Sequence, residues 1–142
     1  PHLRLRRTRQ SEGIRGLVRE NALSAGDFIW PVFVRGGQDI VEEVPSMPGV
    51  MRRSVDRIVE AAQEAADLGI GALCLFPYTG IEERTEDCAG AWDPDNHVNR
   101  AIRAIKKAVP DLPIMTDVAL DTYNINGHDG FVVDGEIVHL AE

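Results

Sequence analysis

The apolar residues of this chain fall into runs and into periodic series, and the two kinds alternate. Residues 28–34 form an almost continuous apolar run, which predicts a buried strand even though Pro31 removes one backbone donor. Further apolar runs at 72–76 and 113–120 predict two more strands. All three runs are of the length that buried strands have.

Two predicted helices separate these strands. Apolar residues recur every three or four positions from Ser54, which suits an N-cap, to Gly69, which suits a C-terminal stop. A second periodic series is predicted to start with Asp93 as its cap and to end before Pro110. The order strand, helix, strand, helix, strand predicts an α/β fold with a parallel sheet.

The two ends of the chain differ from this central region. Ser11 is predicted to cap a short helix within residues 1–27, which we interpret as an N-terminal arm, and residues 28–142 as the α/β body. The segment after the first predicted strand, through Pro45-Ser-Met-Pro-Gly49, is predicted to be a loop, because its prolines cannot continue a helix. Near the C-terminal end, Asp134-Gly135 lies between two apolar runs and has the signature of a β-hairpin turn.

Charge is distributed unevenly over the 142 residues. The net charge is −8, but the first twenty residues hold six arginines and two glutamates, so they carry about +4 and the rest about −12. This asymmetry indicates an arm that docks on an acidic surface. Nucleic acid is the disfavoured alternative, because aromatic residues are not interleaved with the arginines and the acidic body would repel a polyanion.

The two cysteines do not form a disulfide framework. Cys74 lies in an apolar run and is predicted to be buried, whereas Cys88 lies in an acidic loop. No apolar stretch approaches the roughly 18 residues of a membrane span, and the basic start lacks the hydrophobic core of a signal peptide. We therefore expect a cytoplasmic protein that does not enter a membrane.

The best candidate for chemistry is the segment 117–130, which follows the third predicted strand. It contains Asp117, Asp121 and Asp129, together with His128. Carboxylates that converge in this way bind a cation or shift each other's pKa values. A solvated turn is an equally weighted alternative, because aspartate and asparagine are favoured in turns.

Oxygen ligands favour Mg²⁺ or another hard cation over zinc. An EF-hand is excluded by the spacing, and a zinc-thiolate site is disfavoured because neither cysteine is expected to lie near this loop. His128 can ligate a metal, move a proton or hydrogen-bond a carboxylate, and we favour the last role. Tyr123 and His97 are interpreted as packing or surface residues. The chain has no candidate nucleophile, because Lys106 and Lys107 lie together at a helix end.

Several motifs in one order resemble the porphobilinogen synthase (5-aminolevulinate dehydratase) family, in its aspartate-rich, magnesium-type class. The most specific are Met115-Thr-Asp-Val-Ala-Leu-Asp and Gly127-His-Asp-Gly. The supporting motifs extend over nearly the whole chain and include Phe28-Ile-Trp-Pro-Val-Phe-Val, Pro45-Ser-Met-Pro-Gly-Val and Asn96-x-Val-x-Arg-Ala-Ile-Arg-Ala-Ile-Lys.

The resemblance implies a (β/α)8 TIM barrel, of which this chain is the first part, with an arm that wraps a neighbouring subunit in a homo-oligomer, commonly an octamer. It implies the condensation of two 5-aminolevulinate molecules into porphobilinogen, with loss of two waters, in tetrapyrrole (haem) biosynthesis. The cysteine ligands of zinc-using members correspond to Ala119, Asp121 and Asp129. The resemblance therefore disfavours zinc there and favours Mg²⁺ at Asp121 and Asp129, with a metal-free active site as the open alternative, while Asp117 would orient a substrate amine or water.

The chain departs from the family pattern in two ways. The family's Pro-Tyr-Thr-Ser-His-Gly reads Thr122-Tyr-Asn-Ile-Asn-Gly here. The two Schiff-base lysines and the carboxylate-binding arginines of the family belong to the second half of the barrel, so these 142 residues alone are expected to be inactive. The alternative interpretation is a non-catalytic assembly or cation-binding module.

Overall fold

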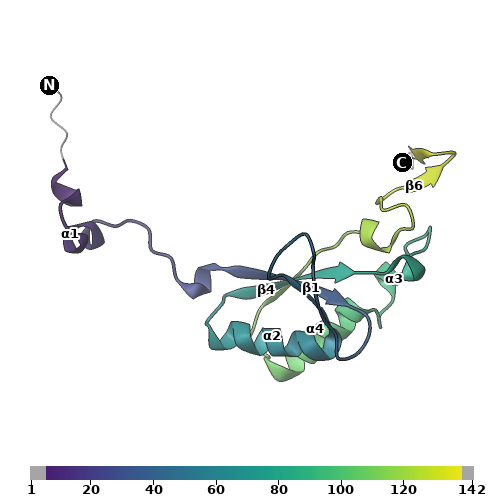
Figure 1. Ribbon diagram of the computed structural model, residues 1–142, viewed down its shortest axis with the longest axis horizontal. Helices are drawn as coiled ribbons and strands as arrows, with labels where there is room; N and C mark the ends of the chain where they lie inside the picture. The colour runs from purple at the N-terminus through teal and green to yellow at the C-terminus, as the bar shows by residue number, and fades with distance from the viewer. Residues whose placement is uncertain (1–5, 139–142) are drawn as a thin grey trace.

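A computed structural model describes residues 6–138 as an α/β body with an extended N-terminal arm (Figure 1). The body holds one five-stranded sheet and one two-stranded sheet in the described residues. The helices are α1 (Glu12–Leu17), α2 (Val55–Asp67), α3 (Ala89–Trp92) and α4 (His97–Ala108), and the short 3-10 helices are η1 (Arg7–Arg9), η2 (Ala25–Asp27), η3 (Ile81–Glu83) and η4 (Asp121–Tyr123). The strands are β1 (Ile29–Arg35), β2 (Val41–Glu43), β3 (Met51–Ser54), β4 (Ala72–Tyr78), β5 (Ile114–Thr116), β6 (Phe131–Val133) and β7 (Glu136–Val138).

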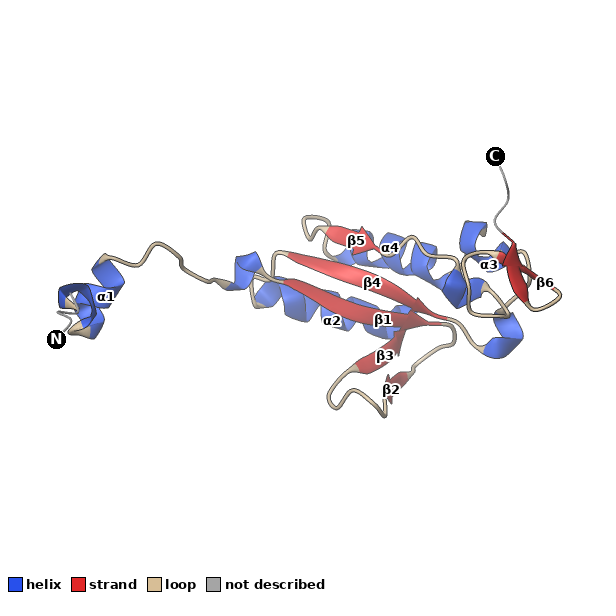
Figure 2. Ribbon diagram, turned by 90° about the horizontal axis from the view of Figure 1, so that it is seen from above, coloured by secondary structure: helices blue, strands red, loops and turns tan. Residues whose placement is uncertain are grey.

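The three predicted strands are confirmed as the parallel strands β1, β4 and β5. The large sheet has the order β2-β3-β1-β4-β5 (Figure 2). β1 and β4 pair along their whole length, from Ile29 opposite Ala72 to Arg35 opposite Tyr78. Because these strands are parallel, their carboxyl ends lie at one edge of the sheet.

The hairpin formed by β2 and β3 was not predicted. β2 pairs antiparallel with β3, and β3 continues the sheet parallel to β1, with Phe33 opposite Arg52. Both strands are short and mostly polar, reading Val-Glu-Glu and Met-Arg-Arg-Ser, so they show no apolar alternation that indicates a strand. The loop prediction was therefore wrong at Val41–Glu43, while residues 45–49 do connect the two strands.

Helices α2 and α4 cover one face of the large sheet (Figures 1 and 2). Their small and branched side chains pack on the residues of β1 and β4 that point toward them, and each fully buried leucine or isoleucine there contributes roughly 1.5–3 kcal/mol. The core consists of Val32, Val34, Ile58, Ala62, Ala65, Leu73, Leu75, Val98, Ala101, Ile105 and Leu112.

The opposite face of the sheet is covered by none of the described helices. Residues that alternate with the core positions point to this face. Phe33 and Phe76 meet there with their ring centroids 6.0 Å apart, and Met115 is 49% exposed. Cys74 lies between the buried residues Leu73 and Leu75 and therefore shares this face. It is half-buried, so the prediction that Cys74 is buried was wrong.

The starts of the two long helices compare differently with the prediction. Ser54 is the N-cap residue of α2, as predicted, but its hydroxyl bonds the backbone of Ile40 rather than that of the helix. α4 is capped by Asn96, whose side chain accepts a hydrogen bond from the backbone of Asn99 (2.8 Å). The prediction of Asp93 as the cap was wrong, because its carboxylate accepts from Asp95 N and closes a turn before the helix.

Two predicted C-terminal boundaries can be compared with the structure. Gly69 follows α2 with a φ of +72°, as expected of a helix stop. The strand predicted at 113–120 is shorter, since β5 ends at Thr116. The bond from Asp117 N to Leu75 O (3.2 Å) is followed by a loop in which Val118 is 93% exposed.

The predicted C-terminal hairpin is confirmed as β6 and β7. Asp134 and Gly135 both have positive φ values, of 52° and 83°, as a type I′ turn requires. The part of the predicted second strand beyond residue 138 lies outside the described residues.

The N-terminal segment extends away from the body (Figure 1). Ser11 caps α1 as predicted, by accepting a hydrogen bond from Ile14 N (3.2 Å). Leu17 is 87% and Leu23 82% exposed, so apolar side chains of this segment lie in solvent. No helix of the described residues is both long and apolar enough to cross a bilayer.

Gly71 is expected to be intolerant of any side chain. A Cβ at this position would overlap the backbone carbonyl of Gly26, which cannot move as a flexible side chain does. Gly71→Ala should therefore lower the free energy of unfolding by about 1–3 kcal/mol, measured by urea denaturation. Gly13→Ala is the matched control, because no atom lies within 4 Å of the added Cβ. Equal stability of the two variants would contradict the proposed clash.

Candidate functional site

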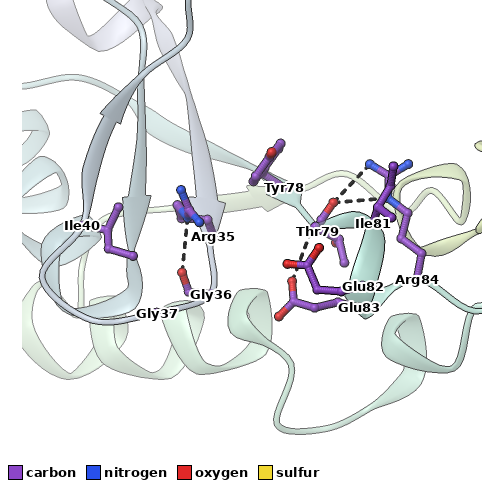
Figure 3. A pocket seen from close by; sticks show the side chains of 11 residues that line it. Arg35, Gly36, Gly37, Ile40, Tyr78, Thr79, Ile81, Glu82, Glu83 and Arg84 are labelled. Carbon is purple, nitrogen blue, oxygen red and sulfur yellow. Dashed lines mark hydrogen bonds between the residues drawn. The ribbon is translucent and has the colours of Figure 1, made fainter.

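The candidate functional side chains of the body lie mostly in the segments that follow β1, β4 and β5. A cavity of about 540 Å³ lies between the loop after β1 and the loop after β4 (Figure 3). Ligands of parallel α/β sheets bind beyond the carboxyl ends of the strands, which is where this cavity lies. We therefore describe this edge of the sheet as the candidate site.

Arginines and an aromatic ring lie side by side at this edge. The guanidinium of Arg52 lies 3.9 Å from the ring centroid of Tyr78, and that of Arg35 lies 5.7 Å from it. The carboxylate of Glu42 forms ion pairs with both guanidinium groups. The stacking and the shared carboxylate hold both arginine side chains in place.

The other wall of the cavity is the loop after β4. Arg84 donates two hydrogen bonds to the carbonyl oxygen of Thr79, at 3.2 and 3.1 Å. Thr79 is 3% exposed, and its hydroxyl has no hydrogen-bond partner within residues 6–138. The carboxylates of Glu82 and Glu83 also line the cavity. Guanidinium and carboxylate groups in one cavity can hold a small molecule that carries both charges.

Two of the three predicted aspartates are brought together. One carboxylate oxygen of Asp129 accepts hydrogen bonds from Leu120 N (2.8 Å) and Asp121 N (2.9 Å), so Asp129 folds back onto the start of η4. Both aspartates are exposed. The convergence of this loop is therefore maintained by charge-assisted hydrogen bonds to the backbone.

Asp117 lies apart from this pair, directly after β5. It is exposed and borders a second cavity, of about 270 Å³, between α3, α4 and residues 116–123. Burial, together with the charge of Asp117, raises the pKa of the Cys74 thiol. Within residues 6–138 no hydrogen bond joins Asp117 to Asp121 or Asp129. The functional roles of the three aspartates stay predictions.

The donor set of Asp121 and Asp129 fits a hard cation. Mg²⁺ usually keeps several waters and uses only one or two carboxylates of the protein, whereas structural zinc needs four ligands. In the part of the chain that the structure describes, no three His, Cys, Asp or Glu side chains are grouped as metal ligands. His128 is exposed and forms no hydrogen bond to a carboxylate there, so its favoured role is not supported.

A buried polar cluster beneath the aspartates was not predicted as a unit. It consists of Cys88, His97, Tyr123 and Asn124, each at most 8% exposed. The amide nitrogen of Asn124 lies 3.4 Å from the sulfur of Cys88. The expectation that neither cysteine lies near this loop was therefore wrong. No sequence signal joins the two residues, because they are 36 positions apart and meet only through the packing of two loops.

His97 and Tyr123 are packing residues, in agreement with the interpretation from the sequence. Their ring centroids lie 6.4 Å apart. Burial raises the pKa of Tyr123. Burial also lowers the pKa of His97, and the charge of Arg100 adds to this effect while that of Glu83 opposes it. The Nε2 atom of His97 has no hydrogen-bond partner in the described residues.

The titration of His97 predicts a loss of stability in mild acid. The ordinary pKa of histidine is near 6.5 and that of folded His97 is lower, so the unfolded state binds more protons between the two values. The free energy of unfolding should be at its full value above about pH 6.5 and fall as the pH drops toward the pKa of folded His97. Urea denaturation between pH 7.5 and 5 measures this fall.

His97→Gln is the control for this prediction, since it has no titrating ring and should lose that part of the pH dependence. The carboxylates contribute equally to the pH dependence of stability in the wild type and in His97→Gln. A ring pKa at or above 6.5, measured by NMR on the folded protein, would contradict the prediction.

Comparison with known proteins identifies the family. The sequence profile of the delta-aminolevulinic acid dehydratase family matches residues 2–141. The delta-aminolevulinic acid dehydratase of Rhodobacter capsulatus is 48% identical over 139 residues, which are 98% of this chain and 42% of that protein. The enzyme of Bradyrhizobium diazoefficiens is 45% identical over 137 residues, covering 96% of this chain and 39% of its own length.

A solved structure gives the same result for the fold. Delta-aminolevulinic acid dehydratase (porphobilinogen synthase) of Toxoplasma gondii ME49, in complex with the reaction product porphobilinogen, superposes with a TM-score of 0.89 at 37% identity. The match covers 99% of this chain and 40% of that one. The predicted first part of a TIM barrel is thus confirmed, and the chain spans about two fifths of the length of these relatives. The chain belongs to the delta-aminolevulinic acid dehydratase, or porphobilinogen synthase, family and is similar to its N-terminal part.

Proposed function

We propose that the protein containing this chain is a porphobilinogen synthase, a lyase that condenses two 5-aminolevulinate molecules into porphobilinogen with loss of two waters. The observation that carries the proposal is the family match over 98% of the chain at 48% identity. The cavity at the strand ends supports it, because 5-aminolevulinate carries an ammonium and a carboxylate group.

We propose that these 142 residues contribute the arm and part of the site, and that alone they are inactive. The family resemblance implies two imine-forming lysines, and neither lysine of the chain suits that role. Lys106 donates hydrogen bonds to the carbonyls of Pro110 and Leu112, which follow α4, so its amine is held by the backbone there. An imine-forming lysine needs instead a depressed pKa in a desolvated pocket.

We propose that three aspartates orient the reacting groups, namely Asp117, Asp121 and Asp129. Carboxylates at the mouth of the barrel can hold an ammonium group or a water while carbon–carbon and carbon–nitrogen bonds form. Mg²⁺ is the proposed cofactor of Asp121 and Asp129, and when bound it would supply positive charge beside developing negative charge. Asp129 already uses one oxygen for the backbone, so its other oxygen and Asp121 are the available donors.

Self-association through residues 1–27 is the proposed role of the arm, in a homo-oligomer that the family resemblance suggests is an octamer. Two observations support a second copy as the partner. The arm exposes Leu17 and Leu23, and the charge of about +4 on its first twenty residues complements the acidic body. A cytoplasmic location is proposed because both thiols are free, as in reducing compartments.

The proposed function is tested with the complete coding sequence. The purified protein should convert 5-aminolevulinate to porphobilinogen, measured by mass spectrometry, and borohydride should trap substrate on a lysine outside residues 1–142. A folded polypeptide of 15.6 kDa that forms no porphobilinogen would instead support the alternative of a non-catalytic module.

The role of the aspartates is tested in the same enzyme by the double substitution Asp121→Asn and Asp129→Asn. Asparagine keeps an oxygen that accepts from the backbone but removes the charge, so turnover or its response to Mg²⁺ should fall on the order of tenfold. Asp134→Asn is the matched control, because Asp134 is an exposed turn residue between β6 and β7. Unchanged turnover with and without Mg²⁺ would refute the role of the pair.

Weakening the proposed contact of the arm is expected to change the size of the oligomer. Replacing both Leu17 and Leu23 by Ser should shift the protein to smaller oligomers, measured by light scattering, because it removes exposed apolar surface that a partner would bury. Gly13→Ala, in the same helix as Leu17, should leave the oligomer unchanged. A double variant with the wild-type mass distribution would contradict docking through the arm.

A further inference from the structure

The loop that carries Asp121 and Asp129 is joined to a second loop, the one between β4 and α4. Thr85 N donates to Tyr123 O (3.0 Å) and Ile125 N donates to Thr85 O (3.2 Å), which makes an isolated parallel bridge between Thr85 and Asn124. These two backbone bonds form between residues about 40 positions apart. A bridge of two bonds between loops is weak unless side chains reinforce it.

Asn124 supplies this reinforcement. Its amide nitrogen donates to Glu86 O (3.1 Å) and to the sulfur of Cys88 (3.4 Å), while its amide oxygen accepts from Asn126 N (2.8 Å). The side chain is 2% exposed, so these bonds are shielded from water. One side chain thus bonds the second loop, at Glu86 and Cys88, and closes a turn in its own loop.

The same segment is bonded to the aspartates. Asn124 N donates to Asp121 O (3.2 Å), and Asp121 N donates to the carboxylate of Asp129 (2.9 Å). A displacement of Asn124 would therefore move the backbone that holds both aspartates. Thr122 adds one contact to the sheet, through its hydroxyl to Pro77 O (3.3 Å).

We infer that Asn124 is a positioning residue, which holds the Asp121 and Asp129 carboxylates in place by clamping their loop to residues 85–88. The inference rests on the proposed function, since it assigns a role in the reaction to a residue that touches neither substrate nor cation. The inference also gives a role to one position of the divergent segment Thr122-Tyr-Asn-Ile-Asn-Gly. At that position Asn124 stands where the family pattern described above has a threonine.

Geometry explains why asparagine is needed. The backbone at Asn124 is extended, with φ of −90° and ψ of 137°, and a threonine is comfortable in that conformation. A threonine hydroxyl can both donate and accept, but it is a single atom one bond nearer the backbone. It therefore cannot occupy the positions of both the amide nitrogen, which bonds Glu86 O, and the amide oxygen, which bonds Asn126 N. Asn124→Thr therefore removes the clamp while the backbone preference is kept.

The experiment compares Asn124→Ala, Asn124→Thr and the matched control Asn126→Ala in the complete enzyme. Asn126 is exposed and contributes only its backbone N–H, which alanine retains. Hydrogen–deuterium exchange of the Thr85 and Ile125 amides reports on the bridge, and kcat and KM for 5-aminolevulinate report on the site. Asn124→Thr keeps the test decisive if the alanine variant does not fold.

Both Asn124 variants should exchange the Thr85 and Ile125 amides about tenfold faster. Their kcat should fall about tenfold or more, because small displacements of catalytic groups slow the reaction strongly. Their KM should change less than about twofold, and amide exchange in other regions should stay unchanged. Asn126→Ala should match the wild type in both measurements.

Unchanged exchange at both amides, or an equal loss of kcat in Asn126→Ala, would overturn the inference. A wild-type enzyme that makes no porphobilinogen would refute the proposed function instead, and the clamp would then stand or fall on the exchange measurement alone.

Discussion

The parallel pairing of β1 with β4 is the constraint on which the rest of the structure depends. Seven consecutive residue pairs fix the register, so Arg35 and Tyr78 end their strands side by side. The same register brings alternate residues of both strands to the face that α2 and α4 cover. A shift of one residue would turn the apolar set to the opposite face and would separate the polar groups at the strand ends. The pairing of β1 with β4 thus determines both the burial of the core and the geometry of the site.

The two faces of the sheet have different environments, and this difference explains several exposed apolar residues. Leu73 and Leu75 are fully buried under the helices, while Cys74 between them is half-buried and Met115 opposite it is exposed. In a closed barrel the face without helices points inward, where side chains from all strands fill the interior. The exposed face is therefore what the first part of such a barrel presents when considered alone.

Features with a local sequence signal were predicted, and features that depend on distant contacts were not. The apolar runs of β1 and β4, the periodic faces of α2 and α4, and the turn at Asp134-Gly135 each depend on neighbouring residues. The β2–β3 hairpin was missed because its stability comes from pairing with β1 and from the ion pairs of Glu42, rather than from apolar alternation. The cap at Asn96 was missed because Asp93, an equally good cap by type, closes the preceding turn.

The same distinction applies to the candidate site. The proximity of Asp121 and Asp129 follows from a loop that returns within nine residues, and the sequence indicated it. The approach of Cys88 to Asn124 follows from the packing of two loops and had no local signal.

The conformation of the loop that carries Asp121 and Asp129 depends on the Asp129 side chain. Its carboxylate accepts two backbone N–H groups at the start of η4, from Leu120 and Asp121. Hydrogen bonds to a carboxylate are shorter and stronger than those between neutral groups, and they fix the orientation of the side chain. The loop can therefore hold its conformation through its own hydrogen bonds, although its two ends are nine residues apart.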